Sequence, residues 1–329
     1  MARPSGFYVV CTIALAGIGL PAQGQRADDA AGYPVRPVRV VIGFTPGGQP
    51  DIVARLIAPK LTEALGQQVV VDNRPGAGGI VGSKIVADAT PDGHTLLTAS
   101  SSHTITPEIY AKVPYDTLRD FAGITSNYTA AYVLVVTPSL GVKTVQDLVA
   151  MAKAKPGQLN FSSAGAGSGT HFAAEVFKQA VQIDVVHIPY KGIPEALTDT
   201  IGGRVQFTMA PLGASLNLVR EGRLRGVAVS SLKRLAVHPD LPTIAESGYP
   251  GFQWDSWGAT FAPAKTPRAI INKLHREFVR ALGDAEVRQR MTALGMDAAP
   301  VTPEQLDKLV VEQVALVKKL ALKAGITPR

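Results

Sequence analysis

Two glycine-rich loops contain the residues best suited to bind a small charged ligand. The first, residues 45–50, includes Gly47 and Gly48 and follows the apolar, β-branched run 39–44. From Asp51 onward, apolar residues recur at the spacing of a helix. A strand, a glycine loop and a helix in this order present unpaired backbone N–H groups and the positive end of a helix dipole, which attract an anion. The alternative is that residues 45–50 are an ordinary connection between a strand and a helix, which has the same sequence pattern and binds no ligand.

The second loop, residues 162–170, repeats this arrangement. It follows a short strand around Phe161 and precedes the amphipathic run 172–180. Ser168 and Thr170 stand where hydroxyl groups either cap a helix or contact a ligand. Two anion-binding helix starts in separate halves of the chain predict a cleft that closes on its ligand from both sides.

Motifs typical of enzymes do not occur in the sequence. Ser168 has Ala166 and Thr170 where a nucleophile elbow requires glycines. The six histidines lack metal-binding spacing, and no P-loop or complete dinucleotide fingerprint is present. His103, in the polar segment 100–103, is either a general base or, as we favour, a hydrogen-bonding loop residue. A hydrolase-type enzyme is thus the less favoured class, and we expect no catalytic residue, metal or cofactor.

Composition narrows the cellular location and the partners. The chain has 329 residues and a formal charge of 33 − 26 = +7, but its basic residues are scattered without interleaved aromatics, which argues against nucleic acid. Arg3, the apolar run 7–20 and the small residues at 22–24 predict a secretory signal peptide over 1–24. The mature chain would lack Cys11, rely on its core alone, and be periplasmic after crossing the inner membrane.

Strands and helices alternate along the rest of the chain, which predicts an α/β fold with parallel βαβ units. Ligands of such sheets bind beyond the carboxyl ends of the strands, where the glycine loops lie. Strands are expected at 69–71, 94–99, 132–137, 184–189, 205–210, 224–230 and 254–262. Helices are expected from Asp51, up to Ala89, and at 144–154, 172–180, 212–220, 267–283, 285–294 and 302–324.

A series of short motifs resembles the Bug or TctC family, the extracytoplasmic substrate-binding proteins of tripartite tricarboxylate transporters. Individually the motifs are weak, but their order and spacing are specific and cover essentially the whole mature chain. The matching segments are 33–39, 46–51, 72–79, 91–97, 113–116, 155–160, 189–192 and 239–243.

The resemblance implies a type II periplasmic-binding-protein fold, with two α/β lobes joined by a two-strand hinge near 124–134 and 248–260. Lobe 1 would comprise 33–128 plus 252–329, and lobe 2 would comprise 129–251. It implies a monomer that captures a small carboxylate by lobe closure and delivers it to the membrane subunits of a transporter. A ligand-sensing periplasmic receptor for a sensor kinase is the alternative, because both roles use the same closed-lobe signal.

The resemblance also implies where the ligand lies, in the first loop, the polar segment, the second loop and one later strand end. Asp51 is left open between ligand contact and helix capping, Trp254 and Trp257 between stacking on the ligand and packing, and Lys191 between pairing with the ligand and a solvated position. The expected ligand-binding residues are Thr45, Gly47, Gly48, Gln49, Asp51, Ser102, His103, Ser163, Ala166, Gly167, Ser168, Gly169, Thr170, Ala210 and Pro211.

Two of these positions depart from the family pattern. Family members commonly have asparagine at the position of Ala166, and many have aspartate-asparagine at Ala210 and Pro211, near the variable end of the ligand. A buried ammonium needs a carboxylate partner, and Ala210 cannot supply one. We therefore expect an apolar or aromatic mono- or dicarboxylate in preference to an amino acid.

Overall fold

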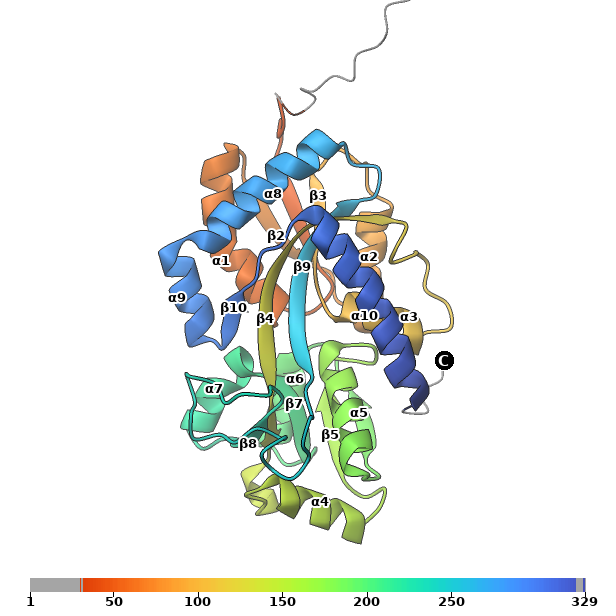
Figure 1. Ribbon diagram of the computed structural model, residues 1–329, viewed down its shortest axis with the longest axis vertical. Helices are drawn as coiled ribbons and strands as arrows, with labels where there is room; N and C mark the ends of the chain where they lie inside the picture. Colours follow the sequence, from red (N-terminus) through yellow and green to blue (C-terminus); the bar gives the residue numbers. More distant parts are fainter. Residues whose placement is uncertain (1–29, 31, 324–327, 329) are drawn as a thin grey trace, which may run out of the picture.

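The computed structural model describes residue 30, residues 32–323 and residue 328, and the predicted signal peptide 1–24 lies outside this range. Figure 1 shows a two-lobed α/β molecule whose lobes are connected by two long strands. The predicted fold class is confirmed.

In lobe 1, the sheet has the strand order β2-β1-β3-β9-β4, with β10 on the far side of β4. The pairs β1/β2 and β1/β3 are parallel, whereas β9 runs antiparallel to both of its neighbours. Its strands are β1 (Val38–Ile42), β2 (Val69–Asn73), β3 (Thr95–Ser100), β9 (Asp255–Pro263), β10 (Met296–Ala298) and the first part of β4 (Phe121–Val136). Its helices are α1 (Gln49–Leu65), η1 (Ala77–Gly79), α2 (Ile80–Ala87), α3 (Ser102–Ile109), α8 (Arg268–Gly283), α9 (Ala285–Ala293) and α10 (Pro303–Lys323).

In lobe 2, the last part of β4 pairs with β8 on one side and β7 on the other, and the sheet continues through β5 to β6. The pairs β5/β6 and β5/β7 are parallel, as expected for βαβ units. Its remaining strands are β5 (Asn160–Ser163), β6 (Val186–Pro189), β7 (Phe207–Pro211) and β8 (Arg225–Val229). Its helices are η2 (Pro138–Leu140), α4 (Val145–Ala154), α5 (Gly169–Val181), α6 (Ile193–Ile201) and α7 (Leu212–Arg220).

The two lobes share strand β4. Its residues up to Ala131 pair with β9, and from Tyr132 onward it pairs with β7. Strand β9 returns the chain from lobe 2 to lobe 1 beside it (Figure 1). We keep the predicted lobe division at 128/129 and 251/252 as a proposal, since the change of partner on β4 lies close to the first of these boundaries.

Local chemistry explains several of these elements. The run Val38–Ile42 is largely buried, with Val40 on one face packed in a cluster with α1 and Val41 on the other in a cluster with α2, as suits a strand covered by helices on both faces. Thr144 and Asp147 form the predicted capping box at the start of α4. The polar segment 100–103, predicted as a loop, instead ends β3 and begins α3. Helix α3 forms because Ile105 and Ile109 are buried in an apolar core, which outweighs the modest helix propensity of its serines and threonines.

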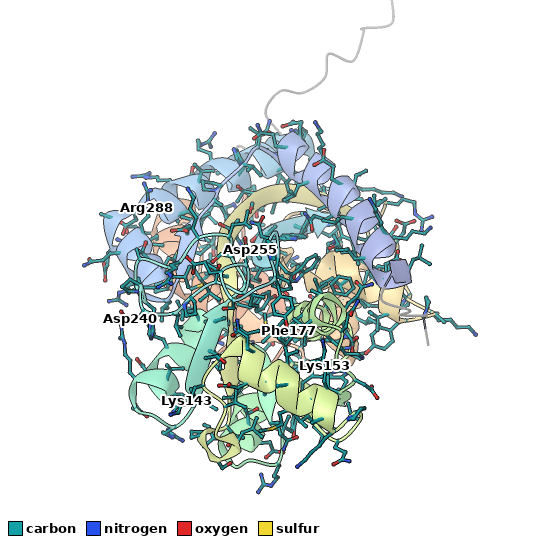
Figure 2. All side chains as sticks on the ribbon, turned by 60° about the horizontal axis from the view of Figure 1, so that its bottom comes forward. Lys143, Lys153, Phe177, Asp240, Asp255 and Arg288 are labelled. Carbon is teal, nitrogen blue, oxygen red and sulfur yellow. The ribbon has the colours of Figure 1, made fainter. Side chains whose placement is uncertain are left out.

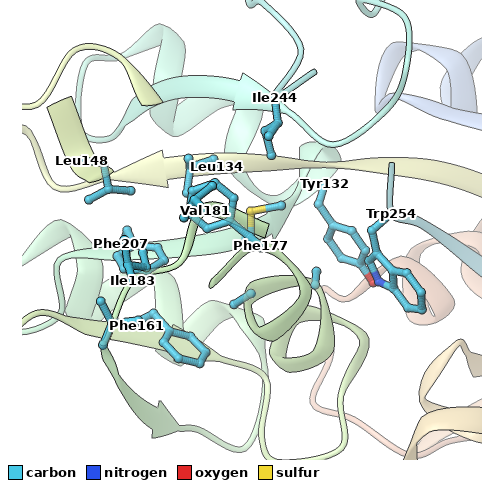
Figure 3. Close-up of a cluster of buried hydrophobic side chains, with 14 of the residues drawn as sticks. Tyr132, Leu134, Leu148, Phe161, Phe177, Val181, Ile183, Phe207, Ile244 and Trp254 are labelled. Atoms are coloured by element: carbon cyan, nitrogen blue, oxygen red, sulfur yellow. The ribbon is translucent and has the colours of Figure 1, made fainter. Parts of the chain in front are cut away.

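One apolar cluster extends from lobe 2 into lobe 1. It joins lobe 2 side chains such as Phe172 to Ile105 of α3 and to Val317 of the C-terminal helix α10. Figure 3 shows Tyr132 and Trp254 at one end of this cluster and Leu148 at the other. In the view of Figure 2, Phe177 lies among the helices and Arg288 at the edge of the molecule. The lobes are therefore in apolar contact as well as covalently joined.

Among the described helices, none is both long and apolar enough to cross a bilayer.

In the hinge, the backbone of Gly258 lies close to the ring of Tyr128, so a substitution at Gly258 tests how tightly β4 and β9 are packed. A Cβ on Gly258 of β9 would overlap the ring of Tyr128, which is fully buried on β4. We expect Gly258→Ala to lower the free energy of unfolding by about 1–3 kcal/mol, because a fully buried ring has no space to move into. Chemical denaturation in the absence of ligand measures this change.

The matched control is Gly283→Ala at the end of α8, where an added Cβ meets no atom within 4 Å. Its stability should stay equal to the wild type or rise by up to about 1 kcal/mol. A Gly258→Ala variant as stable as the wild type would show that β4 and β9 are not held at this distance.

Candidate functional site

The first glycine loop holds the start of α1. Gly48 precedes the helix and has no side chain to cap it, so the first-turn amides that no helix satisfies internally stay available. The Asp51 carboxylate accepts a hydrogen bond from the Gly47 amide at 3.0 Å and pairs with Arg55 at 3.0 Å. Gly47 has a φ of 93°, which favours glycine. Asp51 thus holds the loop before the helix, and its carboxylate does not cap the Gly48 N-cap position.

The second glycine loop holds the start of α5. Ser168 caps this helix by accepting the His171 amide at 3.2 Å, and Thr170 accepts the Ala164 amide at 2.9 Å. The two hydroxyl oxygens lie 3.0 Å apart, so one hydroxyl donates to the other and one O–H remains to donate to a ligand. Below the loop, the Ser163 hydroxyl lies 2.6 Å from the ring Nε2 of His187.

The two helix starts line the same cavity. No Asp, Glu, Lys, Arg or His is among the described residues that line it. A negative charge in this cavity would therefore be balanced by backbone N–H groups, hydroxyls and two helix dipoles. The lining residues are Phe44, Thr45, Gly48, Gln49, Pro50, Ser100, Tyr132, Ala164, Ser168, Gly169, Thr170, Ile193, Pro211 and Ser256.

Hydrogen bonds between the lobes close the cavity. On one side, the Thr45 hydroxyl donates to the Glu195 carboxylate at 3.3 Å. On another, the Tyr110 hydroxyl of lobe 1 donates to the Ala166 carbonyl of lobe 2 at 3.2 Å. The backbone of Gly78 also lies against that of Ala166. These contacts hold the two lobes against each other beside the cavity.

The structure brings seven of the predicted ligand-binding residues to the cavity wall and leaves the others behind it. Behind the wall, Gly167 has a φ of 77° and donates its amide to the ring of His171 at 3.3 Å, which shapes the second loop. Ser102 accepts a hydrogen bond from Ser100, which itself lines the cavity. On the wall lie Thr45, Gly48, Gln49, Ser168, Gly169, Thr170 and Pro211; behind it lie Gly47, Asp51, Ser102, His103, Ser163, Ala166, Gly167 and Ala210.

His103 lies away from the cavity, in helix α3. Its ring is only 2% exposed and packs against Phe121 and Phe261, with centroid distances of 4.7 and 4.6 Å. Burial lowers its pKa to about 3. Neither ring nitrogen has a hydrogen-bond partner among the residues that the structure describes. The geometry provides neither a general base nor a ligand contact.

Ala210 also lies away from the cavity. It pairs with Val133 inside the sheet of lobe 2 and is fully buried in an apolar cluster, so that only its neighbour Pro211 reaches the ligand space. Trp254 packs against Phe172 with a centroid distance of 5.0 Å, the packing alternative stated above. Lys191 is exposed.

Sequence reasoning missed the floor of the cavity. Tyr132 and Ser256 come from the hinge strands β4 and β9, and their sequence neighbours read as ordinary strand residues. Three other lining residues lie next to loops that the sequence analysis identified. Their position just beyond a predicted strand could have marked them as ligand contacts: Phe44, Ser100 and Ile193.

A family model described as "Tripartite tricarboxylate transporter family receptor" matches residues 53–326. The chain belongs to this family. BugT of Bordetella pertussis is 36% identical over 304 residues, covering 92% of this chain and 91% of BugT. Among solved structures, an R. palustris protein with adipate matches with a TM-score of 0.87 at 34% identity, covering 90% of this chain and 100% of that chain. MatC from Rhodopseudomonas palustris with bound malate matches with a TM-score of 0.83 at 31% identity, over 88% and 99% of the two chains.

In this TctC-family receptor, the burial of His103 has a consequence for stability. The folded protein keeps the ring neutral down to a pH of about 3, whereas the unfolded chain binds a proton below about 6.5. Between these values the unfolded state binds more protons, so the free energy of unfolding falls as the pH is lowered, by up to about 1.4 kcal/mol per pH unit from this group.

Between pH 6 and about 4, we expect the free energy of unfolding of His103→Gln to depend less steeply on pH than that of the wild type. The difference should correspond to one bound proton. Unfolding titrations at several pH values measure the slope, and a uniform loss of packing cancels in the comparison with the wild type. The control is Ile105→Val, a packing change at another buried position of α3 that removes no titratable group and should leave the slope unchanged. Equal slopes for His103→Gln and the wild type would mean that His103 is accessible to protons in the folded protein.

Proposed function

We propose that this protein is a periplasmic solute-binding protein that captures a small organic carboxylate between its two lobes and delivers it to the membrane subunits of a tripartite tricarboxylate transporter. It acts as a monomer and has no catalytic role. The proposal extends the family assignment with the geometry of the cavity.

One observation carries the proposal: the starts of α1 and α5, from different lobes, line one cavity without any charged side chain among its described residues. Helix starts bind carboxylates through backbone amides and the dipole. A ligand that contacts both starts also joins the lobes, which stabilises the closed arrangement by its differential affinity for that state. The similar R. palustris structures hold adipate and malate, both of which are carboxylates.

The lining also bears on the type of carboxylate. Two acidic groups beside the cavity wall have partners of their own: Asp51 pairs with Arg55, and Glu195 accepts a hydrogen bond from the Thr45 hydroxyl. A ligand ammonium buried here would lack a carboxylate partner, which is costly. Phe44, Ile193 and Pro211 offer apolar contacts instead. These contacts support an apolar or aromatic acid over an amino acid.

A thermal-shift screen of mono-, di- and tricarboxylates, aromatic acids and amino acids tests the proposal. A ligand at about a hundred times its dissociation constant should add about 2.7 kcal/mol to the free energy of unfolding. Each stabilising acid is then incubated with the protein and analysed for chemical change. Stabilisation by no acid, or turnover of the acid that stabilises best, contradicts the proposal.

Removing the Ser168 hydroxyl separates ligand binding from helix capping. Ser168→Ala should weaken binding of the best acid by about 1–3 kcal/mol, because the backbone donors of α5 remain. It should also reduce the stability of the free protein by about 1 kcal/mol through the lost cap. Calorimetric titration and denaturation of the same variant measure both effects.

Thr144→Ala is the matched control, since Thr144 caps α4 in the same way and does not line the cavity. It should reduce stability by about 1 kcal/mol and leave affinity unchanged. If both variants bind the acid like the wild type, Ser168 is only a capping residue and its hydroxyl does not contact the carboxylate.

A further inference from the structure

The floor of the cavity contains polar groups that the carboxylate-binding loops do not use. Ser256 of β9 and Tyr132 of β4 line the cavity from the hinge, and Gln49 lines it from the first turn of α1. Gln49 is 4% exposed and Ser256 is 1% exposed. These side chains come from three separate elements, so the site is built by the fold and not by one loop.

Two of these groups have unsatisfied hydrogen-bonding capacity. Within the described part of the chain, neither Gln49 Nε2 nor Ser256 Oγ has a hydrogen-bond partner. The hydroxyls of Tyr128 and Tyr132 lie near Ser256, but not with the geometry of a hydrogen bond. A buried polar group without a partner costs about 1–3 kcal/mol, so groups of this kind in a native cavity indicate a ligand that pairs with them.

The chemistry of the floor favours an uncharged ligand group. Gln49 offers a neutral amide donor, while serine and tyrosine hydroxyls both donate and accept. Burial raises the pKa of Tyr132, so its hydroxyl stays protonated. A second carboxylate would find no cation among the described lining residues and would lie on the side of Asp255, whose charge Tyr132 already senses. Figure 2 shows Asp255 near the middle of the molecule.

Asp255 does not offer an easy site for an ammonium either. Its carboxylate accepts a hydrogen bond from the Gln253 side chain at 2.8 Å and one from the Ser230 hydroxyl at 3.5 Å, and it does not line the cavity. A hydroxyl or a carbonyl oxygen matches the floor without any buried net charge.

We propose that Gln49 and Ser256, with Tyr132, determine specificity by binding a hydroxyl or oxo group of the ligand, so that the protein selects hydroxy- and oxo-carboxylates over the unsubstituted acids. This inference rests on the proposed function, because the carboxylate itself is held by the two helix starts.

Matched sets of acids test it. Butanoate, succinate and 3-phenylpropionate are each compared with their 2-hydroxy, 3-hydroxy (where it exists) and 2-oxo derivatives by calorimetric titration of the dialysed mature protein. On the skeleton that binds best, at least one hydroxy or oxo acid should bind about tenfold tighter than the unsubstituted acid. The 2-amino acids of the same skeletons should bind no tighter than the unsubstituted acids.

Gln49→Leu and Ser256→Ala should reduce that preference to within about twofold, because each removes a side-chain group that would pair with the hydroxyl or oxo oxygen. Ser247→Ala is the control: this buried hydroxyl donates to the Thr243 carbonyl, and neither residue lines the cavity, so its loss should leave the preference intact. If Ser256→Ala does not fold, Gln49→Leu still gives the result.

The outcomes separate the two proposals. An unsubstituted acid or a second carboxylate that binds as tightly as the hydroxy and oxo acids overturns the specificity assignment and leaves carboxylate binding in place. A preference that persists in both variants assigns it to other residues. Failure of every acid to bind the wild type overturns the proposed function and this inference together.

Discussion

The arrangement of the cavity depends on one strand, β4, which is hydrogen bonded in both lobes. Its first part pairs with β9 and its last part with β7 and β8, so the two sheets have a common element at the point where they meet. Helices α1 and α5 follow strands of different lobes, yet their N-terminal ends line the same small cavity. A change of direction in β4 would move these ends apart, because no other described strand belongs to both sheets.

In the proposed site, backbone groups bind the carboxylate, where many anion sites rely on arginine or lysine. Amides at a helix start are fixed by the helix itself, so they lose little conformational freedom when a ligand binds. Their field is also confined to the first turn. This limits the position of a carboxylate more narrowly than a flexible cation would, and it leaves the neutral residues Gln49, Tyr132 and Ser256 to distinguish one acid from another.

The sequence allowed the helix starts to be predicted because turn chemistry is local: Gly48 and Ser168 act within a few residues of their position in the chain. The floor could not be predicted in this way. Tyr132 and Ser256 meet only through the pairing of β4 with β9, and a strand pattern does not specify which partner it takes. His103 was misplaced for a related reason, since its polar neighbours suggested a loop and only tertiary packing buries it among Phe121 and Phe261.

The position of β9 in the sheet constrains the order in which the chain can fold. Strand β9 lies between β3 and β4, although it follows both by more than a hundred residues in sequence (Figure 1). The sheet of lobe 1 therefore stays divided until residues 255–263 are present, whereas the strands β5, β6, β7 and β8 of lobe 2 are contiguous with the end of β4. Contacts of such high sequence separation form slowly. A chain that ends before residue 255 would assemble the sheet of lobe 2 and leave the edges of β3 and β4 open to pair with other strands, which makes such a truncation a route to aggregation.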